Sequence, residues 1–390
     1  MTARGGDSKG SRDRLWAEID LGAIAHNVRE LRRVTRPETR LLVAVKADGY
    51  GHGAVRVART ALAHGATDLG VAHLDEGLAL RDQEIRAPIL IFGHTPADRT
   101  DELLANDLTP CIFSVEAARA LSSAALQTGR VVPAHVKIDT GMGRLGLQCD
   151  ALRPPGTNSA VADILTMAQL PGIVLQGIFT HFATSDHADT RMARQQLDRF
   201  LALLAQLETA GCAIAVRHAA NSGAIFQMPR ANLDMVRAGI SVYGLYPSSE
   251  VPSDRIHLKP ALALKAHVIH LKTVPAGTPI SYGGTHVTSR PTTIATVPGG
   301  YADGYRRGLS NRGVMLVGGC RVPIVGRVCM DLTMIDVGQV PGVRVGDEVV
   351  LIGRQGAETI SADQLADTLE TISYEVVSAL TARVPRIYFD

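Results

Sequence analysis

The sequence predicts an α/β protein in which an N-terminal parallel (β/α)8 barrel precedes a C-terminal domain built mainly from β-strands. Short apolar runs alternate with amphipathic segments about eight times in the first part of the chain, a rhythm typical of a closed parallel barrel. After about Gly244 the stretch YPSSEVPSDR introduces short β-rich runs separated by glycine and proline turns. The 390 residues, 46% of them hydrophobic, are enough for two domains with large cores. An open, doubly wound sheet is the alternative architecture for the first domain.

Four segments follow from these observations. Residues 1–13 are polar and glycine-rich, which predicts a disordered tail, and they lack the apolar central region of a signal peptide. Residues 14–20 form a strand that precedes the barrel and needs a partner, so we expect it to join the β domain. Residues 21–247 form the barrel and residues 248–390 the β domain.

The individual elements are predicted from the apolar runs and their spacing. The expected barrel strands are Leu41–Val45, Leu69–Ala72, Pro88–Phe92, Pro110–Phe113, Ala134–Ile138, Ile173–Phe179, Ile214–Arg217 and Val236–Val242. The expected strands of the second domain are Ala263–Lys272, Thr292–Val297, Val314–Val317, Val322–Val325, Met334–Val337 and Glu348–Ile352. In that domain only Ser361–Leu369 is predicted to be helical.

Composition excludes several classes of function. The formal net charge of +2 and the lack of long basic runs argue against a nucleic-acid or membrane partner. No apolar run is long enough to span a bilayer. Five scattered cysteines show no metal-ligand spacing, so we expect reduced thiols, a cytoplasmic protein and no metal site.

The stretch LLVAVKADGYGHG, residues 41–53, is the strongest local signal in the chain. A buried strand delivers Lys46 to a glycine-rich turn. Partial desolvation lowers the pKa of an ammonium group there and favours the free amine that attacks an aldehyde carbon. The stretch therefore predicts a lysine that forms a Schiff base.

Other polar residues lie at or just after the ends of predicted barrel strands, namely Lys137, Arg144, His181 and His218, and the last predicted strand runs through Arg237. A barrel does not need polar side chains at successive strand ends for its stability, whereas an active site built from βα loops does. Together these residues predict one site with Lys46.

Two loops are suited to binding an anion. Asn221-Ser222-Gly223 opens a predicted helix, and Gly239 and Ile240 offer backbone amides near the last strand. Tyr50 and Tyr374 add phenolic donors. We expect these groups to bind a phosphate.

Eight motifs occur in order: KADGYGHG, KIDTGMGRLG, THFATSD, HAANS, MVRAGISVYGL, ISYGGT, GYADGY and GRVCMD. With these motifs the chain resembles the bacterial alanine racemases, fold-type III enzymes that depend on pyridoxal 5′-phosphate, from Leu15 to Asp390. Asp48-Gly49 replaces the Asn-Ala common in that family, a departure that concerns turn geometry more than chemistry.

The resemblance implies a two-base reaction. Lys46 would carry the cofactor and act as the base on the face of the D-enantiomer, and Tyr282 would be the opposite base, because a planar carbanion must be protonated from either side. His181 would bond Tyr282, and Arg237 would lie against His181 and the pyridine nitrogen. A guanidinium keeps its proton, which leaves the ring nitrogen largely unprotonated and limits side reactions.

The resemblance also implies roles for the remaining residues. The cofactor-binding residues would be Lys46, Tyr50, His218, Asn221, Ser222, Arg237, Gly239, Ile240 and Tyr374. Arg144, Met330 and Asp331 would bind the substrate, with Met330 limiting the side chain to favour alanine without strict exclusion. Asp186, Tyr301, Arg306 and Arg327 would form a polar entrance corridor, and Lys137 would be the lysine that is carbamylated in some relatives.

Finally, the resemblance implies a head-to-tail homodimer that shares its active sites and supplies D-alanine for peptidoglycan. Three alternatives remain open at this point: a pyridoxal-phosphate racemase of broader specificity, a decarboxylase on the same fold, and a non-catalytic protein that binds the cofactor.

Overall fold

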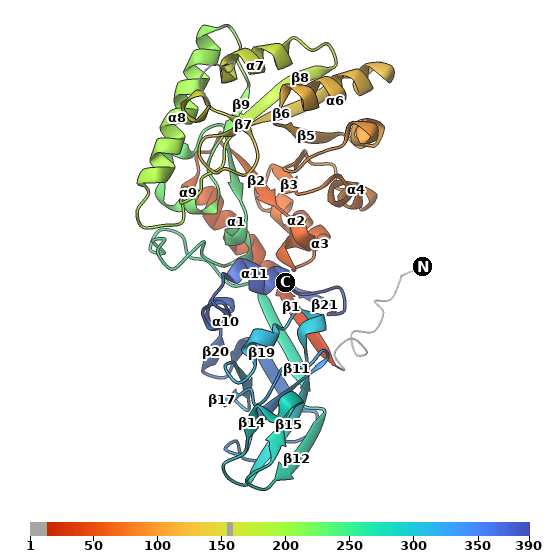
Figure 1. Cartoon of the computed structure of the whole chain (residues 1–390), viewed down its shortest axis with the longest axis vertical. Helices are drawn as coiled ribbons and strands as arrows, with labels where there is room; N and C mark the ends of the chain where they lie inside the picture. Colours follow the sequence, from red (N-terminus) through yellow and green to blue (C-terminus); the bar gives the residue numbers. More distant parts are fainter. Residues whose placement is uncertain (1–13, 154–158) are drawn as a thin grey trace. The chain divides into compact units, whose positions relative to one another are not determined.

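The computed structural model describes residues 14–153 and 159–390, so the predicted tail at 1–13 lies outside the described residues. The chain divides into two compact units (Figure 1). The barrel unit comprises Ala23–Gly49 and Ala54–Lys259, and the β unit comprises Tyr50–Gly53 and Pro260–Asp390 together with the residues up to Gly22. No helix in the described ranges is long and apolar enough to cross a membrane.

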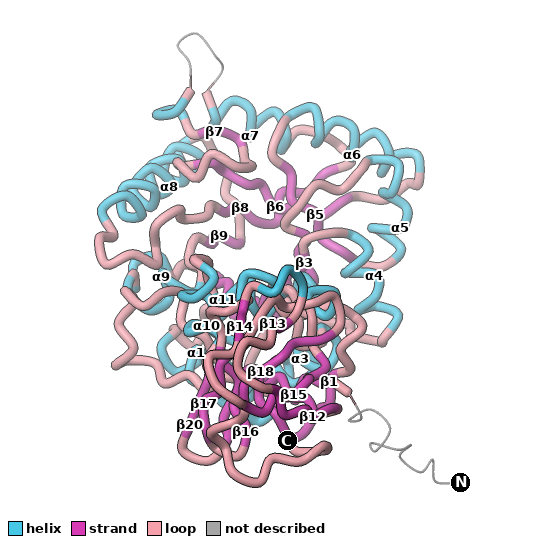
Figure 2. The backbone as a smooth tube through the Cα atoms, turned by 60° about the horizontal axis from the view of Figure 1, so that its bottom comes forward, coloured by secondary structure: helices cyan, strands magenta, loops and turns pink. Residues whose placement is uncertain are grey.

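The barrel unit is a closed ring of parallel strands. Its strands are β2 (Arg40–Ala44), β3 (Asp68–Val71), β4 (Ile89–Ile91), β5 (Leu108–Ile112), β6 (Val132–Asp139), β8 (Ile173–Phe179), β9 (Val216–His218) and β10 (Met235–Ala238). They pair in the order β5-β4-β3-β2-β10-β9-β8-β6, and the pairing of β5 with β6 closes the ring (Figure 2). This closure confirms the predicted barrel and excludes the open sheet.

Helices surround the strands on the outside of this ring (Figure 2). They are α1 (Leu21–Val34), α3 (Ala54–Ala63), α4 (Leu74–Asp82), α5 (Thr100–Ala105), α6 (Val115–Gln127), α7 (Ala160–Ala168), α8 (Arg191–Thr209) and α9 (Ser222–Gln227). Ser114, Ser159 and Asn221 cap α6, α7 and α9, because each side chain accepts a backbone N–H of the first turn. The caps fix where each βα loop ends.

The last barrel strand is shorter than the sequence predicted. β10 ends at Ala238, and the rest of the expected strand forms the 3₁₀ helix η5 (Ile240–Tyr243). Gly239, with φ −112° and ψ −105°, turns the chain between them. Because the residues of η5 are fully buried, the apolar run continues past the point where the strand stops.

Among the described residues, the β unit contains a large sheet, a small sheet and a two-stranded pair formed by β13 (Pro279–Ile280) and β14 (His286–Val287). The large sheet has the order β17-β16-β19-β11-β1-β21, and the small sheet has the order β12-β15-β18. Their strands are β1 (Leu15–Asp20), β11 (Leu262–His267), β12 (His270–Val274), β15 (Thr292–Pro298), β16 (Val314–Val317), β17 (Cys320–Pro323), β18 (Leu332–Asp336), β19 (Glu348–Gln355) and β21 (Arg386–Phe389). β1 pairs antiparallel with β11 and parallel with β21.

Two predictions for this unit were wrong. The single strand expected at Ala263–Lys272 is two strands in different sheets, because Val268 N donates to Asp347 and Ile269 N donates to Thr296. The segment Ser361–Leu369 is not the only helix, since α10 (Ala362–Leu369) is followed by α11 (Ser373–Ser378).

The segment Tyr50–Gly53 groups with the β unit although barrel residues flank it on both sides. Arg386 Nε donates to the carbonyl oxygen of Gly51 at 3.0 Å. A Cβ on Gly51 would collide with the carbonyl oxygen of Val377, and one on Gly53 would collide with the phenol of Tyr388. Glycine at both positions therefore allows the chain to pass close to α11 and β21.

Candidate active site

Lys46 lies two residues beyond the buried strand β2, at the start of a left-handed turn. Ala47, Asp48 and Gly49 have φ values of 52°, 51° and 60°. Each non-glycine residue in this conformation costs about 1–2 kcal/mol, so the turn is strained. Strain of this kind is concentrated at functional sites, where the surrounding structure maintains it.

Glu76 on α4 holds this turn. Its carboxylate accepts the N–H of Ala47 at 2.7 Å and the N–H of Ala72 at 2.6 Å, which ties the loop after β2 to the loop after β3. Asp48 adds a second tie by accepting the N–H of Ala54 at 2.9 Å. Sequence reasoning did not identify Glu76, because the residue lies 30 positions after Lys46 and belongs to no motif near it.

Partial burial lowers the pKa of Lys46, and the positive charge of Arg144 lowers it further, while Glu76 acts in the opposite direction. The sequence predicted this direction. Lys137 on β6 has its pKa lowered to about 8, first by burial and then by the neighbouring cations. The site thus holds two amines that give up a proton more readily than an exposed lysine.

Arg237 and the histidines form a buried network at the ends of β8, β9 and β10. Arg237 Nη1 donates to His218 Nδ1 at 2.9 Å, and Nη2 donates to the carbonyl oxygens of Thr180 and Ala219 at 2.7 and 3.0 Å. Nη2 also lies 3.4 Å from His181 Nδ1. In the described part of the chain, Arg237 forms no salt bridge, so it is not one half of a structural ion pair.

Burial is the main cause of the pKa shifts in this network. It lowers the pKa of Arg237 to about 9 and, with the charge of Arg237, places those of His181 and His218 well below their ordinary value. The pKa of His135, a buried neighbour on β6, falls to about 3. These imidazoles are therefore neutral at physiological pH.

The neutral histidines predict an acid-sensitive fold. Below pH 6.5 an unfolded chain protonates His135, whereas the folded chain does so only near pH 3. The free energy of unfolding of the apoprotein should therefore fall as the pH decreases from 6.5, by about 1.4 kcal/mol per pH unit for each such histidine. Urea titrations at several pH values measure this slope.

A matched comparison isolates the cause of that slope. The variant H135L should reduce the slope by the contribution of one histidine, about 1.4 kcal/mol per pH unit, whereas H187Q, which alters an exposed histidine, should not reduce it. A wild-type stability that does not change between pH 7 and pH 5 would contradict the prediction.

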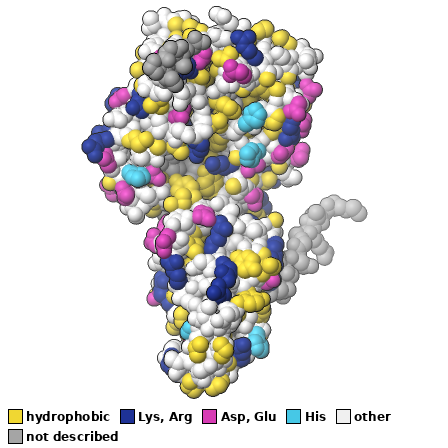
Figure 3. Space-filling view, in the orientation of Figure 1, with side chains coloured by type: hydrophobic (Ala, Val, Ile, Leu, Met, Phe, Trp, Pro, Cys, Tyr) yellow, Lys and Arg dark blue, Asp and Glu magenta, His cyan; other side chains and the backbone are white. Residues whose placement is uncertain are grey.

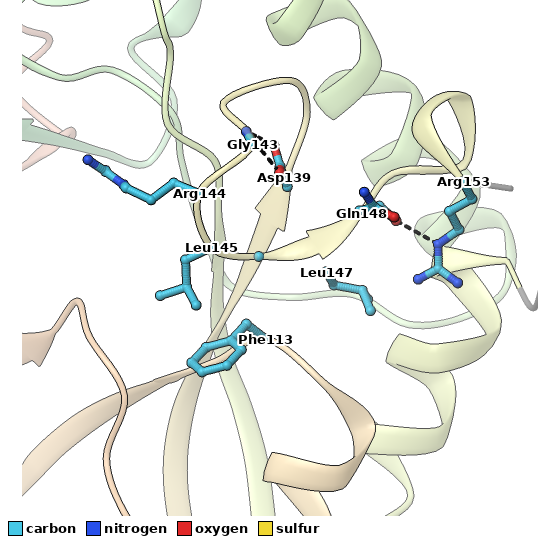
Figure 4. A pocket seen from close by; sticks show the side chains of 9 residues that line it. Phe113, Asp139, Gly143, Arg144, Leu145, Leu147, Gln148 and Arg153 are labelled. Atoms are coloured by element: carbon cyan, nitrogen blue, oxygen red, sulfur yellow. Dashed lines mark hydrogen bonds between the residues drawn. The ribbon is translucent and has the colours of Figure 1, made fainter.

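The loop after β6 carries Arg144. Asp139 accepts the N–H groups of Gly141, Met142 and Gly143 at 2.8–3.2 Å, which folds the loop back over the strand end. The loop borders a pocket of about 490 Å³, and Arg144 extends from one side of it (Figure 4). The pocket is also lined by Phe113, Leu145, Leu147, Gln148 and Arg153.

The proposed anion-binding loops also meet in the structure. Ser222 Oγ lies 2.9 Å from Ser241 Oγ and accepts the N–H of Gly239 at 2.9 Å. Asn221 caps α9 and accepts the hydroxyl of Ser185 at 2.7 Å. Among the described residues, no backbone acceptor takes the N–H of Ile240, which begins η5. These hydroxyl, amide and N–H groups form one polar cluster near Arg237.

The β unit carries the remaining candidates. Tyr282 is 71% exposed and belongs to a turn whose first residue, Ser281, has a φ of 63°. Ser281 Oγ donates to the carbonyl oxygen of Arg327 at 2.7 Å. Met330 and Tyr301 are exposed by 53% and 42%, on segments joined by backbone hydrogen bonds. The structure therefore brings the segments of Tyr282, Arg327, Met330 and Tyr301 together.

Other candidates in this unit have separate partners. Asp331 pairs with Arg383 at 2.6 Å, and Arg306 pairs with Glu375 at 2.9 Å. The rings of Tyr50 and Tyr374 lie 6.3 Å apart, and burial raises the pKa of Tyr50 to about 12. In the barrel unit, the carbonyl oxygen of Asp186 accepts the hydroxyl of Ser248.

The space-filling view shows basic side chains among the hydrophobic ones where the surface is hollowed (Figure 3). Positive charges also act on the two lysines, since the pKa values of both Lys46 and Lys137 are lowered by Arg144 and that of Lys137 is also lowered by Arg237. Such a concentration of cations favours an anionic ligand.

Comparison with known proteins identifies the family of this chain. Residues 19–247 match "Alanine racemase, N-terminal domain" and residues 261–388 match "Alanine racemase, C-terminal domain". The curated alanine racemases of Desulfosudis oleivorans and Carboxydothermus hydrogenoformans are 55% and 46% identical to this chain. Each match covers 96% of this chain, and 96% and 99% of the respective relatives.

Solved structures agree with this result. The alanine racemase of Clostridium difficile 630 superposes with a TM-score of 0.91 at 38% identity, covering 96% of both chains. The Bacillus anthracis alanine racemase with bound L-Ala-P gives 0.88 at 38% identity, covering 97% of this chain and 95% of that one. The sequence, the barrel and the β domain of the present chain show that it belongs to the alanine racemase family.

Proposed function

We propose that this protein interconverts L-alanine and D-alanine by a two-base reaction that uses pyridoxal 5′-phosphate. The observation that carries the proposal is the match of both family domains along nearly the whole chain. The position of Lys46, between a buried strand and a turn held by Glu76, supports it.

The donor set fits this cofactor. Lys46, Lys137, Arg144 and Arg237 act on one another as cations, which suits a phosphate and a phenolate. Within the described residues the hydrogen bonds of Arg237 use Nη1 and Nη2, so its Nε–H remains for a ligand. The cofactor, when bound, withdraws electrons from the substrate's α-carbon and makes the α-proton acidic.

The chain's own residues would hold the cofactor as follows. Lys46 would attach it covalently, and Arg237 would face the pyridine nitrogen with His218 behind it. The phosphate would be bound by residues that donate or position N–H and O–H groups: Tyr50, Asn221, Ser222, Gly239, Ile240 and Tyr374.

Lys46 and Tyr282 would move the α-proton from opposite faces of the substrate. The lowered pKa of Lys46 supplies a free amine at moderate pH. The exposed phenol of Tyr282 is a weak base by itself. A neutral His181, whose pKa lies well below the ordinary value, can exchange a hydrogen bond with that phenol without adding a charge.

Tyr282 belongs to the β unit and Lys46 to the barrel unit. We propose a head-to-tail homodimer in which the exposed Tyr282 completes the site of a second copy. Met330 and Asp331 of the β unit would join it, and two-fold symmetry would create two equal sites. An isolated monomer would then be inactive.

The substrate's carboxylate would bind Arg144, and Met330 would limit the size of its side chain. Asp186, Tyr301, Arg306 and Arg327 would line the entrance. For Lys137, a pKa of about 8 leaves roughly one amine in ten neutral at pH 7. Only the neutral amine adds carbon dioxide, so this pKa supports carbamylation of Lys137 beside Arg144.

The product would serve peptidoglycan synthesis in the cytoplasm. Support for the compartment comes from the cysteines, all five of which are unpaired thiols within the described ranges.

Exchange of the α-proton tests the proposed function directly. In D₂O the holoenzyme should incorporate deuterium at the α-carbon of both alanine enantiomers and bring them to equal amounts. NMR follows the exchange and chiral chromatography follows the ratio. Cofactor binding without exchange would favour the non-catalytic alternative, and equal kcat/KM values for serine and alanine would favour a broader racemase.

A further inference from the structure

Inside the barrel, three buried side chains form a hydrogen-bonded series that begins at Arg237. Arg237 Nη1 contacts His218 Nδ1 at 2.9 Å, and His218 Nε2 contacts His135 Nδ1 at 2.9 Å. The three side chains are exposed by at most 5%. No motif and no proposed role above uses His135, yet it ends this series.

The backbone makes room for the series at one position. His135 and His218 lie on β6 and β9, which are separated by β8. On β8, Gly177 is in register with His135, and a Cβ there would lie 2.5 Å from the ring of His135. Glycine therefore allows the imidazole to lie across the intervening strand and reach His218.

The direction of each hydrogen bond follows from the chemistry of the groups. A guanidinium only donates, so His218 Nδ1 must accept. A neutral imidazole that accepts at Nδ1 carries its proton on Nε2, and this proton must be donated to His135 Nδ1. His135 in turn carries its own proton on Nε2. One arrangement of protons satisfies all three residues.

The remaining contacts of Arg237 explain why this arrangement of protons matters. Nη2 is fixed by two carbonyl oxygens, whereas Nη1 is fixed by His218. His218 also stacks on Phe179, with ring centroids 4.7 Å apart and planes at 12°. If His218 carried its proton on Nδ1, two donors would face each other, and the guanidinium would have to turn away.

We propose that His135 is a positioning residue for Arg237, because it accepts the Nε2 proton of His218 and thereby stabilises the tautomer in which His218 Nδ1 holds Arg237 and directs its free Nε–H group. The role of the Arg237 Nε–H group rests on the proposed function, in which that group faces the pyridine nitrogen. The hydrogen bonds among Arg237, His218 and His135 do not depend on it.

Two matched variants test the role of His135. In H135N the side-chain oxygen occupies the place of Nδ1 and keeps an acceptor. In H135L a side chain of similar shape removes the acceptor. A purely structural role for the ring would make the two variants behave alike.

The first measurement is ¹⁵N NMR of histidine-labelled apoprotein, with the His218 signals assigned by their loss in H218Q. We expect His218 to be protonated on Nε2 alone in the wild type and in H135N. In H135L the Nε2–H of His218 loses its acceptor, so we expect a measurable fraction of the Nδ1-protonated form, at the cost of the contact with Arg237. A wild-type His218 protonated on Nδ1, or a tautomer that H135L does not change, would overturn the proposal.

The second measurement uses the holoenzyme and counts the pyruvate released per racemisation event, which reports transfer of the amino group to the cofactor. H135L should raise this ratio about tenfold, and H135N should restore most of the difference. Equal ratios in the two variants would overturn the proposal. If H135L does not fold, the wild-type tautomer and H135N still decide it.

The two hypotheses fail in different ways. A correct tautomer in a protein that neither racemises nor exchanges alanine would refute the proposed function and leave the histidine series intact. Normal racemisation with the wrong tautomer would refute the role of His135 alone.

Discussion

The variant Y282F is expected to lower racemisation of alanine by roughly 10²–10⁴-fold while the visible absorbance of the bound cofactor persists. The substitution removes one hydroxyl from a side chain that is 71% exposed, so the β unit should fold normally. Steady-state rates in both directions and the absorption spectrum measure the two effects.

The predicted defect in Y282F has a directional signature. In the proposed mechanism Lys46 remains on the face of D-alanine, so exchange of the α-proton of D-alanine with D₂O should continue without conversion to L-alanine. Y246F, which removes a hydroxyl bonded to the carbonyl oxygen of Ile256, is the matched control and should racemise normally. Wild-type rates in Y282F would eliminate the two-base scheme.

Replacing Lys46 should have the larger effect. K46A is expected to lose covalent attachment of the cofactor and to lower racemisation by about 10³-fold or more, because in the proposed mechanism one amine serves as both anchor and base. Borohydride reduction of the wild-type holoenzyme, followed by peptide mass mapping, should find the cofactor on Lys46.

Lys137 makes this experiment discriminating. It is buried beside the same cations and its pKa is about 8, so pKa alone would make it a competitor for the aldehyde. K137A should keep the reducible bond, whereas K46A should not. Recovery of the reduced cofactor on Lys137 of the wild type would reverse the assignment of the two lysines.

The fold was predicted well where the chain repeats a simple pattern. The apolar runs at Leu69–Ala72 and Ile173–Phe179 are short and bounded by polar residues, and both form strands within one residue of the expected bounds. The failures occur where a strand-like sequence continues while the backbone changes. Val236–Val242 is largely apolar but turns at Gly239, and Ala263–Lys272, in which apolar residues are interspersed with lysines and histidines, changes sheet at Val268.

The site was predictable at the level of strand ends. Lys46 and His181 follow apolar strands, and Lys137 and His218 lie near the carboxyl ends of theirs, so the barrel rule places all four at one end. The role of Glu76 could not be predicted from the sequence, because it depends on two backbone amides that no sequence pattern marks. The role of His135 could not be predicted either, because a histidine inside a strand resembles an ordinary core residue until Gly177 is seen beside it.

The grouping of Tyr50–Gly53 with the β unit has a consequence for biosynthesis. Gly51 and Gly53 are packed by α11 and β21, which contain Val377, Arg386 and Tyr388. A ribosome makes the loop after Lys46 early, whereas the residues of α11 and β21 that hold its far end are made much later. The loop beyond Lys46 can therefore be completed only after β21 has been synthesised, and a chain truncated before β21 would lack this support for the loop.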